Sequence, residues 1–296
     1  MVLTIVNPAA AGGRLGREWP KLQRRLAAAD LESEVIFTEA PGHATELVAR
    51  VVAAGCQRVL VAGGDGTVCE AAEGMAGSKN CELAVLPLGT GNDGARTLGI
   101  PTDLVGAARV AATGITRPVD LIRVGDRMVL NAIGIGLTAD INQRAARIKW
   151  VRGIAVYLGT AAVSLFKFRA PKIRIVADER IIDSTMTILA VHNGPTTGGG
   201  FALTPNAVPD DGLLDATLVP DVPVTGRLQR LIGALRGTLH TMDGSVALQA
   251  KVLELHHEEP LAVHFDGNAG TLEGPVTRFE VVPRALKVVV PSMRRG

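Results

Sequence analysis

An aspartate lies among glycines in the stretch GGDGTVCEA, which runs from Gly63 to Ala71 and directly follows the apolar run VLVA. Glycines between a strand and a helix leave backbone N–H groups free to bind an anion, and the helix dipole favours negative charge there. The spacing is neither GxGxxG nor a P-loop, which argues against the common dinucleotide and Walker sites. Because a carboxylate beside a phosphate is repulsive without a bridging cation, Asp65 indicates Mg²⁺. A tight strand–helix turn capped by this aspartate is the alternative.

Two similar glycine-rich loops accompany this one. NPAAAGGR (Asn7–Arg14) follows the first apolar run, and PLGTGNDGAR (Pro87–Arg96) follows the fourth. Each loop alone fits a plain turn. Three such loops at the carboxyl ends of parallel strands would lie where α/β folds bind their ligands, so together they predict one binding site.

The elements that must position these loops alternate between strand and helix. VLTIVN, EVIFT, RVLVAGG and ELAVLPLG are short apolar runs typical of buried strands. Helices are expected at Leu15–Ala29, Ala44–Ala54, Thr67–Ala76 and Asp103–Ala112, with Thr102 as the N-cap of the last. This order predicts an α/β domain with a parallel sheet.

From about Val119 the pattern changes to paired strands. VDLIRV-GD-RMVLNAIGIG, KIRIVA-DE-RIIDSTMTILAVHNG and KVLELHH-EEP-LAVHFDGN each predict a hairpin, and one helical insert is expected from about Arg152 to Phe168. The predicted fold class is therefore an α/β N-terminal domain followed by a mostly antiparallel, sandwich-like C-terminal domain. The tail ALKVVVP fits either sheet.

The composition limits the class of protein. The 296 residues are 47% hydrophobic, and a net charge of +2 is too small to indicate nucleic acid as a partner. The cysteines Cys56, Cys69 and Cys81 have no metal-binding spacing, which favours a reducing compartment. No signal peptide is recognised, and the apolar stretch from Gly153 to Phe166 is shorter than the ~20 residues that span a bilayer. We expect a cytoplasmic protein, at most peripherally attached to a membrane. The sequence does not decide whether the chain forms a homodimer.

The glycine loops also carry a resemblance. NPAAAGG, GGDGTVCEA and PLGTGNDGAR resemble, in order and spacing, the nucleotide-binding motifs of the diacylglycerol kinase/sphingosine kinase family, above all its soluble bacterial diacylglycerol kinase-like members. VDLIRV, LNAIGIG, NGPTTGGGFALTPNAVPDDGLLDATLV and HFDGNAG are similar to the family's second-domain motifs, so the resemblance covers nearly the whole chain. GGDGT alone also fits NAD kinases, whereas NPAAAGG and DDGLLD favour the lipid kinases.

The resemblance implies an ATP-dependent lipid kinase that phosphorylates the hydroxyl of a lipid alcohol such as diacylglycerol. ATP and Mg²⁺ would bind in the cleft between an α/β nucleotide-binding domain, residues 1–118, and a β-sandwich lipid domain, residues 119–284. The last strand, 285–291, would return to the first domain. The sequence does not identify the acceptor lipid, because scattered Leu, Val and Ile residues do not distinguish one lipid alcohol from another.

By the same resemblance, the contacts to ATP would come from the three loops and one strand end. They are Asn7, Pro8, Ala9, Ala10, Ala11, Gly12, Thr38, Gly64, Asp65, Gly66, Thr67, Val68, Cys69, Glu70 and Thr90. Amides, hydroxyls and glycine backbone suit phosphates and ribose. A threonine at a strand end, such as Thr38, is nevertheless ordinary in any α/β protein.

The family also places carboxylates around its metals. Asp65, Asp93 and Asp120 would surround the catalytic Mg²⁺ and the acceptor hydroxyl, since clustered carboxylates repel unless a metal or proton intervenes. Taken singly, Asp93 fits an Asx cap and Asp120 the start of a hairpin. A second, structural Mg²⁺ would take the Asp211 carboxylate and two backbone carbonyls, which come from Val208 and Leu213. A Pro-Asp-Asp-Gly turn explains that stretch equally well.

Three positions depart from the family pattern. Cys69 stands where an Asn is usual, Thr138 where an Asp is usual, and Asn268 where the family has the Glu regarded as the catalytic base. Asn cannot accept a proton at neutral pH. The alternative function is therefore a nucleotide-binding pseudokinase or a regulatory lipid binder, and an active enzyme would be slow, with Asp65 or Glu273 replacing the base. An NAD kinase is a third reading.

A basic segment surrounds the expected helical insert. No acidic residue occurs from Ile141 to Ala177, and the apolar helix has basic residues on both sides. They are Arg144, Arg147, Lys149, Arg152, Lys167, Arg169, Lys172 and Arg174. A basic rim around an apolar helix suits contact with an anionic membrane surface, where a lipid kinase meets its substrate. A buried helix with solvated ends is the alternative.

Overall fold

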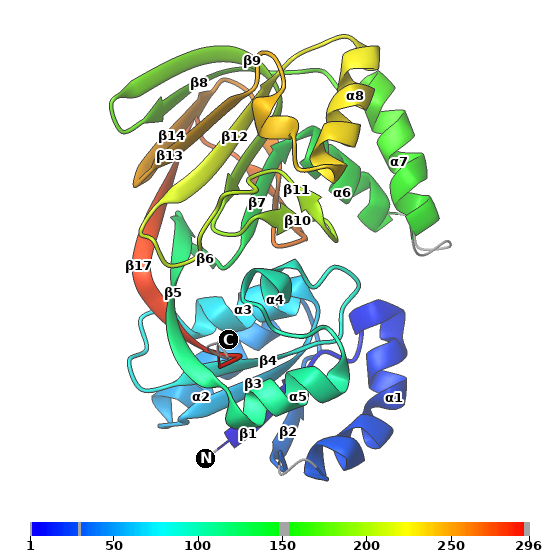
Figure 1. Ribbon diagram of the computed structural model, residues 1–296, viewed down its shortest axis with the longest axis vertical. Coiled ribbons are helices and arrows are strands. Elements are labelled where there is room, and N and C mark those ends of the chain that lie inside the picture. The colour runs from blue at the N-terminus through cyan, green and yellow to red at the C-terminus, as the bar shows by residue number, and fades with distance from the viewer. Residues whose placement is uncertain (1, 29–30, 148–153, 293–296) are drawn as a thin grey trace. The chain divides into compact units, whose positions relative to one another are not determined.

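The structure is a computed structural model that describes residues 2–28, 31–147 and 154–292, and these fall into two compact units (Figure 1). Unit 1 contains the chain up to Leu121, the short segment Pro209–Asp211 and the chain from Val282. Unit 2 contains Ile122–Val208 and Gly212–Val281.

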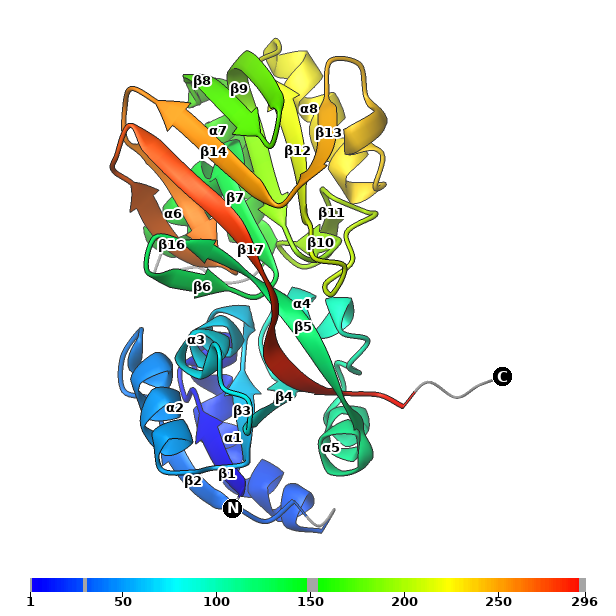
Figure 2. The same cartoon turned by 90° about the vertical axis from the view of Figure 1, so that its left-hand side faces the viewer.

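Unit 1 is an α/β domain whose strands run parallel in the order β2-β1-β3-β4-β17. Its elements are β1 (Val2–Val6), α1 (Ala10–Ala27), β2 (Glu34–Phe37), α2 (His43–Ala53), β3 (Arg58–Gly63), α3 (Asp65–Met75), β4 (Glu82–Pro87), α4 (Asp93–Thr97), α5 (Leu104–Thr113) and the start of β5 (Ile115–Val124). Figure 2 shows α2 and α3 next to each other. The predicted parallel sheet is confirmed. The N-cap of α5 is Asp103, whose side chain accepts from the Gly106 N–H, so Thr102 was the wrong choice.

Unit 2 is a β-sandwich. One sheet has the order β9-β8-β14-β17, and the other has the order β13-β12-β9-β7-β15-β16. The long strand β9 belongs to both sheets, since Arg180–Thr185 pair with β8 and Ile188–His192 pair with β7. The elements are β6 (Arg127–Val129), β7 (Ala132–Gly136), α6 (Leu137–Arg147), α7 (Ile154–Lys167), β8 (Lys172–Ala177), β9 (Arg180–His192), β10 (Thr196–Thr197), β11 (Phe201–Ala202), β12 (Leu214–Pro220), α8 (Val224–Leu235), the 3₁₀ turn η1 (Leu239–Thr241), β13 (Val246–Ala250), β14 (Val252–His257), β15 (Leu261–Phe265), β16 (Asn268–Leu272) and β17 (Val276–Val290).

The predicted sandwich is confirmed, but its details differ from the sequence reading. The β5–β6 and β8–β9 hairpins form as expected. The third predicted hairpin is wrong, because β14 pairs with β8 and β17 whereas β15 pairs with β7 and β16. Helices α6 and α8 were missed. The last strand adds to unit 1 through Val288, which pairs parallel to Leu83 of β4.

The core of each unit is aliphatic. In unit 2, Leu165 of α7, Ala234 of α8 and Leu137 of α6 pack with strand residues such as Ala190 in one buried cluster. Within the described residues, no helix combines the length and the apolar composition needed to cross a membrane.

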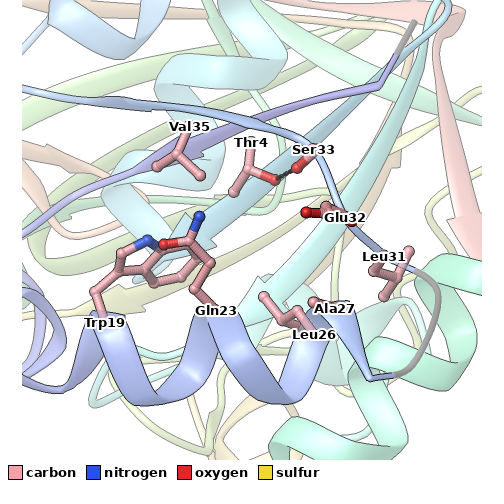
Figure 3. A pocket seen from close by; sticks show the side chains of 9 residues that line it. All are labelled: Thr4, Trp19, Gln23, Leu26, Ala27, Leu31, Glu32, Ser33 and Val35. Carbon is pink, nitrogen blue, oxygen red and sulfur yellow. Dashed lines mark hydrogen bonds between the residues drawn. The ribbon is translucent and has the colours of Figure 1, made fainter.

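A small pocket lies in unit 1 between α1 and the strands β1 and β2 (Figure 3). Trp19 and Gln23 of α1 line it together with Thr4 and Val35, and Thr4 Oγ1 lies 2.5 Å from Ser33 Oγ. Its other walls come from α1 and from residues 31–33, which precede β2, whereas α/β folds bind ligands beyond the carboxyl ends of their strands. The glycine loops that follow β1, β3 and β4 lie at those carboxyl ends.

Candidate functional site

The strand order of unit 1 marks one position as the place for a ligand. The connection from β1 leads to β2 on one side, whereas β3 pairs with β1 on its other side. Crevices open at such a reversal, outside the carboxyl ends of the two central strands. Asn7 follows β1 and Gly64 follows β3, so the first two glycine loops lie at this point.

Asn7 joins these two loops. Its Nδ2 donates to Thr67 Oγ1 at 2.8 Å, and its Oδ1 accepts from the Ala9 N–H at 3.0 Å. The loop continues with Ala11, Gly12 and Gly13 in the left-handed region, with φ of 49°, 70° and 82°. Successive backbone N–H groups in turns of this kind form concavities that bind anions. In the first loop the Ala10 and Gly13 N–H groups donate to the Asn7 and Ala9 carbonyls, at 3.1 and 2.9 Å, so only its other N–H groups could meet a phosphate.

The second and third loops touch through their glycines. A methyl group on Gly89 would overlap the Cα of Gly64, and a methyl on Gly63 would lie 2.7 Å from the Thr67 Cβ. The two backbones can approach only because these residues have no side chain. Close packing of the loops thus explains these glycines without a ligand.

Asp65 and Asp93 meet beside the third loop. A Cβ on Gly91 would lie 2.6 Å from Asp65 Oδ2 and 3.3 Å from Asp93 Oδ2, so the two carboxylates converge on the same glycine. Asp65 Oδ2 accepts from the Asn92 N–H at 2.6 Å, and its Oδ1 accepts from the Gly94 N–H at 3.0 Å. Asp65 therefore holds the N-terminus of α4, a role that the sequence did not reveal.

Burial raises the pKa of the Asp65 carboxyl, and the neighbouring charge of Asp93 raises it further, although the N–H bonds from Gly94 and Asn92 act in the opposite direction. The Asp93 side chain is buried and pairs with Arg96, whose Nη1 lies 3.2 Å from Asp93 Oδ1. Arg96 Nη1 also donates to the Gly91 carbonyl. Arg96 thus places a positive charge beside Asp93.

The Asp65–Asp93 pair has the chemistry of a Mg²⁺ site. Mg²⁺ binds through one or two carboxylates and keeps several waters, and each carboxylate oxygen has a lone pair beyond the one used by an N–H. A bound cation would also relieve the repulsion between the two groups. The donor set therefore fits the ion.

Asp120 contacts the backbone of the last strand. Its carboxylate is buried and accepts from the Arg284 N–H at 2.7 Å, where Arg284 has a left-handed backbone with φ of 53°. Among residues 2–28, 31–147 and 154–292, no group of three or more His, Cys, Asp or Glu side chains could hold a metal. The Asp120 carboxylate thus binds the backbone of β17, and the roles of Asp65, Asp93 and Asp120 toward Mg²⁺ and the acceptor hydroxyl stay predictions.

The other predicted ATP contacts of unit 1 have varied surroundings. The Thr38 N–H donates to the Val6 carbonyl at 2.9 Å and its side chain is buried, whereas Thr90 is exposed. Val68 and Cys69 are buried in the core, which leaves only their backbone for a ligand. The Glu70 carboxylate accepts from the Ala44 N–H at 3.3 Å and so caps α2. Their roles toward ATP stay predictions.

Asn268 is the first residue of β16, directly after a tight turn. Asp266 and Gly267 have φ of 46° and 88°, which is the two-residue Asp-Gly turn that matches the twist of a hairpin. The Asp266 carboxylate, which is buried, accepts three backbone N–H groups, from Leu130, Asn131 and Ala132, at 3.1, 3.1 and 2.7 Å. Sequence reasoning missed this role, although an Asp-Gly pair between alternating runs signals the turn.

The suggestion that Glu273 replaces the missing base is wrong. Asn268–Leu272 form the extended strand β16, and Glu273 follows at its far end. At about 3.3 Å per residue, the two Cα atoms are roughly 16 Å apart. Glu273 cannot occupy the position that Asn268 holds.

The PDDGLLD stretch is anchored to β5. Arg117 forms a bidentate salt bridge with Asp210, with Nε–Oδ2 at 2.7 Å and Nη2–Oδ1 at 2.5 Å. The Pro209 carbonyl accepts from the Asp120 N–H at 2.8 Å. Asp211 itself is exposed. The proposed metal site of Val208, Asp211 and Leu213 stays a prediction.

Comparisons with known proteins agree with these features. Residues 1–124 match the diacylglycerol kinase catalytic domain family, and residues 131–290 match the YegS C-terminal NAD kinase beta sandwich-like domain family. A Pseudomonas aeruginosa protein named "probable lipid kinase YegS-like" is 35% identical, with 98% of this chain and 94% of that protein covered. A relative of the same name from Xanthomonas euvesicatoria is 32% identical, with 88% of each covered.

Solved structures give the same picture. A diacylglycerol kinase from Bacillus anthracis is 26% identical with a TM-score of 0.74, and the match covers 98% of this chain and 96% of that one. An Archaeoglobus fulgidus NAD kinase, crystallised with ATP, shares the fold at 13% identity and a TM-score of 0.52, with 98% and 93% covered. Fold and glycine loops together define a kinase of the diacylglycerol kinase class. The chain belongs to the YegS-like lipid kinase family.

Proposed function

We propose that this lipid kinase transfers the γ-phosphoryl group of ATP, in the presence of Mg²⁺, to the hydroxyl of a lipid alcohol such as diacylglycerol. The observation that carries the proposal is the convergence of Asp65 and Asp93 on Gly91, next to the glycine loops that follow β1 and β3. Membership of the lipid kinase family supports a phosphotransferase, and the acceptor and the metal are part of the proposal.

The chain's own groups would act mainly by positioning. Phosphoryl transfer requires little covalent participation from a protein and depends on orientation and on stabilisation of charge. The N–H groups of the first loop and of the start of α3 would orient the phosphates, and Asn7 would hold these loops together through Thr67. Asp65 and Asp93 would hold Mg²⁺, which when bound neutralises charge on the phosphates.

The acceptor proton needs a base, and Asn268 cannot supply one. A general base contributes typically about 10²–10⁴-fold, so an enzyme without it would be slow rather than dead. Asn268 is also the observation that favours the second candidate, a nucleotide-binding pseudokinase.

The first test measures nucleotide binding by calorimetry with Mg²⁺·ATP. We expect Asp65→Asn and Asp93→Asn each to weaken binding at least tenfold, whereas Asp126→Asn, at an exposed turn, should change nothing. Unchanged affinity in both folded variants would contradict the proposed site.

The second test measures transfer of labelled phosphate from ATP to a panel of lipid alcohols in mixed micelles, with NAD as a further acceptor. We expect slow phosphorylation of a lipid alcohol and at least tenfold faster turnover in Asn268→Glu. A fast wild type that Asn268→Glu slows would mean that another residue is the base. Labelling of NAD alone would contradict the lipid assignment, and ATP binding without transfer in either protein would favour the pseudokinase.

A further inference from the structure

Arg230 of α8 is buried but has few partners in the protein. The residue is 9% exposed, and its Nη2 donates to the Asp243 carbonyl at 2.7 Å. Its Nε is buried and has no hydrogen-bond partner within the described residues. A guanidinium carries five N–H donors, and a charge withdrawn from water is costly unless an opposite charge and hydrogen bonds compensate it. The protein's own groups therefore satisfy this side chain only in part.

Within the described residues, no carboxylate forms an ion pair with Arg230. No acidic residue occurs from Val222 to Met242, a stretch that contains all of α8. Asp221 precedes the helix, but its carboxylate accepts from Arg227 Nη2 at 2.7 Å. Asp243 bonds Arg230 through its backbone carbonyl, and its side chain is exposed. Of the two buried arginines of α8, only Arg227 has a carboxylate partner in the part of the chain that the structure describes.

The first turn of α8 is also open to an anion. The helix begins at Val224, no side chain caps its start, and the Arg227 N–H donates to the Pro223 carbonyl at 3.0 Å. The N–H groups of residues 224–226 come before this first bond of the helix and point out of its end. Together with the helix dipole, such N–H groups favour negative charge.

The Arg230 guanidinium lies beside this first turn. A Cβ on Gly226 would be 3.8 Å from Arg230 Nη1, as expected from the tilt of helical side chains toward the N-terminus. Nη1 is therefore within roughly 6 Å of the Gly226 nitrogen. One phosphate group, whose oxygens each accept at about 2.8 Å, can bridge two donors at this separation. The guanidinium and the helix end can thus hold the same anion.

A second glycine lies on the other side of the guanidinium. A Cβ on Gly244, which has a φ of 76°, would be 4.0 Å from Arg230 Nη2. Glycine at positions 226 and 244 thus leaves space on both sides of the charged group. The next residue, Ser245, has a buried Oγ without a hydrogen-bond partner within the described residues. A hydroxyl of this kind is a further donor for an anion.

The basic residues around α7 differ from Arg230. Arg144 and Arg174 pair with neighbouring aspartates, at 2.6 and 2.7 Å. The side chain of Arg147 and the whole of Lys149 and Arg152 lie outside the described residues. Contact of that segment with an anionic membrane stays a prediction.

We propose that Arg230 and the first turn of α8 form a binding site for a phosphate group, either as the free ion or as the monoester of a larger molecule. Arg230 Nη1 and the N–H groups of residues 224–226 donate to its oxygens. The charge of such a group, about −1.5 to −2, compensates the buried guanidinium. The site uses none of the glycine loops of unit 1, so it is independent of the proposed function.

The test is a titration of the wild type with inorganic phosphate at constant ionic strength, with chloride as the reference anion, followed by nuclear magnetic resonance of backbone and arginine N–H groups. We expect saturable shifts of the N–H signals of residues 224–226 and of Arg230 Nε–H. Arg230→Gln should weaken this binding at least tenfold, because a charge-assisted hydrogen bond is lost. Arg230→Lys, which keeps the charge, should weaken it less. Arg236→Gln, at an exposed position at the other end of α8, is the matched control and should change nothing.

The outcomes separate this site from others. Shifts at residues 224–226 that chloride reproduces equally, or unchanged phosphate affinity in folded Arg230→Gln, would overturn the inference. Shifts confined to the glycine loops of unit 1 would overturn it as well and would assign the phosphate to the proposed nucleotide site. Because the wild type alone gives the first result, the test does not depend on the stability of a variant.

A second titration, with a short-chain phosphatidate, identifies the source of the phosphate group. Equal affinity of phosphatidate and inorganic phosphate at the α8 signals would mean that the site takes the free ion. Binding of phosphatidate that is at least tenfold tighter would mean that it takes a lipid phosphate. Either result supports the site, whereas the loss of both ligands' shifts at α8 would contradict it.

Discussion

A pair of buried histidines should make unit 2 sensitive to acid. His192 of β9 pairs with Ala132 of β7, and His264 of β15 pairs with Gly134 of the same strand, so the two rings flank β7. Both rings are buried, and the His264 Nε2 fills the space that a Cβ on Gly134 would need. Burial lowers the pKa of His192 to about 3, with a further contribution from His264, and lowers the pKa of His264 to about 4.

The hydrogen bonds show why the rings stay neutral. Thr204 Oγ1 donates to the Gly194 carbonyl at 3.0 Å, so it accepts from His192 Nδ1 at 2.8 Å. His192 Nε2 and His264 Nδ1 are buried and have no hydrogen-bond partner within the described residues. In the part of the chain that the structure describes, no ion pair joins either ring to a carboxylate that would favour its charged form.

The size of the effect follows from linkage. In the unfolded chain both histidines take up protons below their ordinary pKa of 6.5, whereas in the folded chain they do not until about pH 4 and 3. The stabilisation is therefore complete above pH 6.5 and is lost as the pH falls. Two protons correspond to about 2.7 kcal/mol per pH unit, so at pH 5 the loss amounts to about 4 kcal/mol relative to pH 8.

Urea unfolding followed by circular dichroism from pH 8 to pH 5 measures this slope. Below about pH 6, where the unfolded histidines are mostly protonated, His264→Leu and His192→Leu should each flatten the slope by up to about 1.4 kcal/mol per pH unit, whatever they do to the stability at pH 8. The double variant should lose both contributions. Identical slopes in wild type and double variant would refute the reasoning, because the folded rings would then titrate as they do in the unfolded chain.

Two further predictions concern unit 1. Gly89→Ala should lower the free energy of unfolding by about 1–3 kcal/mol and also weaken Mg²⁺·ATP binding, because its methyl would push the backbone at Gly64 away. Urea unfolding measures the first effect and calorimetry the second. A stable variant with full affinity would contradict the close packing of these loops. Burial raises the pKa of the Cys81 thiol to about 11, and the nearby Cys56 contributes to the shift. Alkylation of Cys81 by iodoacetamide at pH 8 should therefore be about a hundredfold slower in the native protein than in urea. Rapid labelling of the native protein, measured by mass spectrometry, would contradict this prediction.

The first half of the fold could be read from the sequence because its signals are local. Four apolar runs, each followed by a helical period, leave little choice but a parallel sheet, and their loops must gather at one edge. The partners of the loop side chains are not local. Asp65 bonds the N–H groups of Asn92 and Gly94, and Glu70 bonds that of Ala44, in other loops of the chain. A motif shows that these acids are present but not that the fold uses them.

The second half was harder because strand alternation does not specify a partner. β14 and β15 are consecutive, yet they pair in different sheets, and only the tertiary packing decides this. Helix α8 was missed because Gly226 and Gly233 weaken its helical signal. Gly233 is there for packing, since a Cβ on it would lie 2.5 Å from Met242 Sδ. A glycine that permits close packing thus lowers the helix propensity by which α8 could have been predicted.

The turn before Asn268 has a structural role that does not depend on residue 268, the position where the family has its base. Asp266 accepts three N–H groups ahead of β7, and Gly267 adopts a φ of 88°, so the fold requires both residues whatever follows them. The presence of Asp-Gly is therefore no argument for catalysis. Residue 268 is the first of β16 and is half-buried. A Glu carboxylate at this position could accept a proton, whereas the Asn amide cannot. A change at this position alters the acid–base chemistry while the turn that holds it stays intact, which is why its effect on turnover separates a slow kinase from a protein that only binds nucleotide.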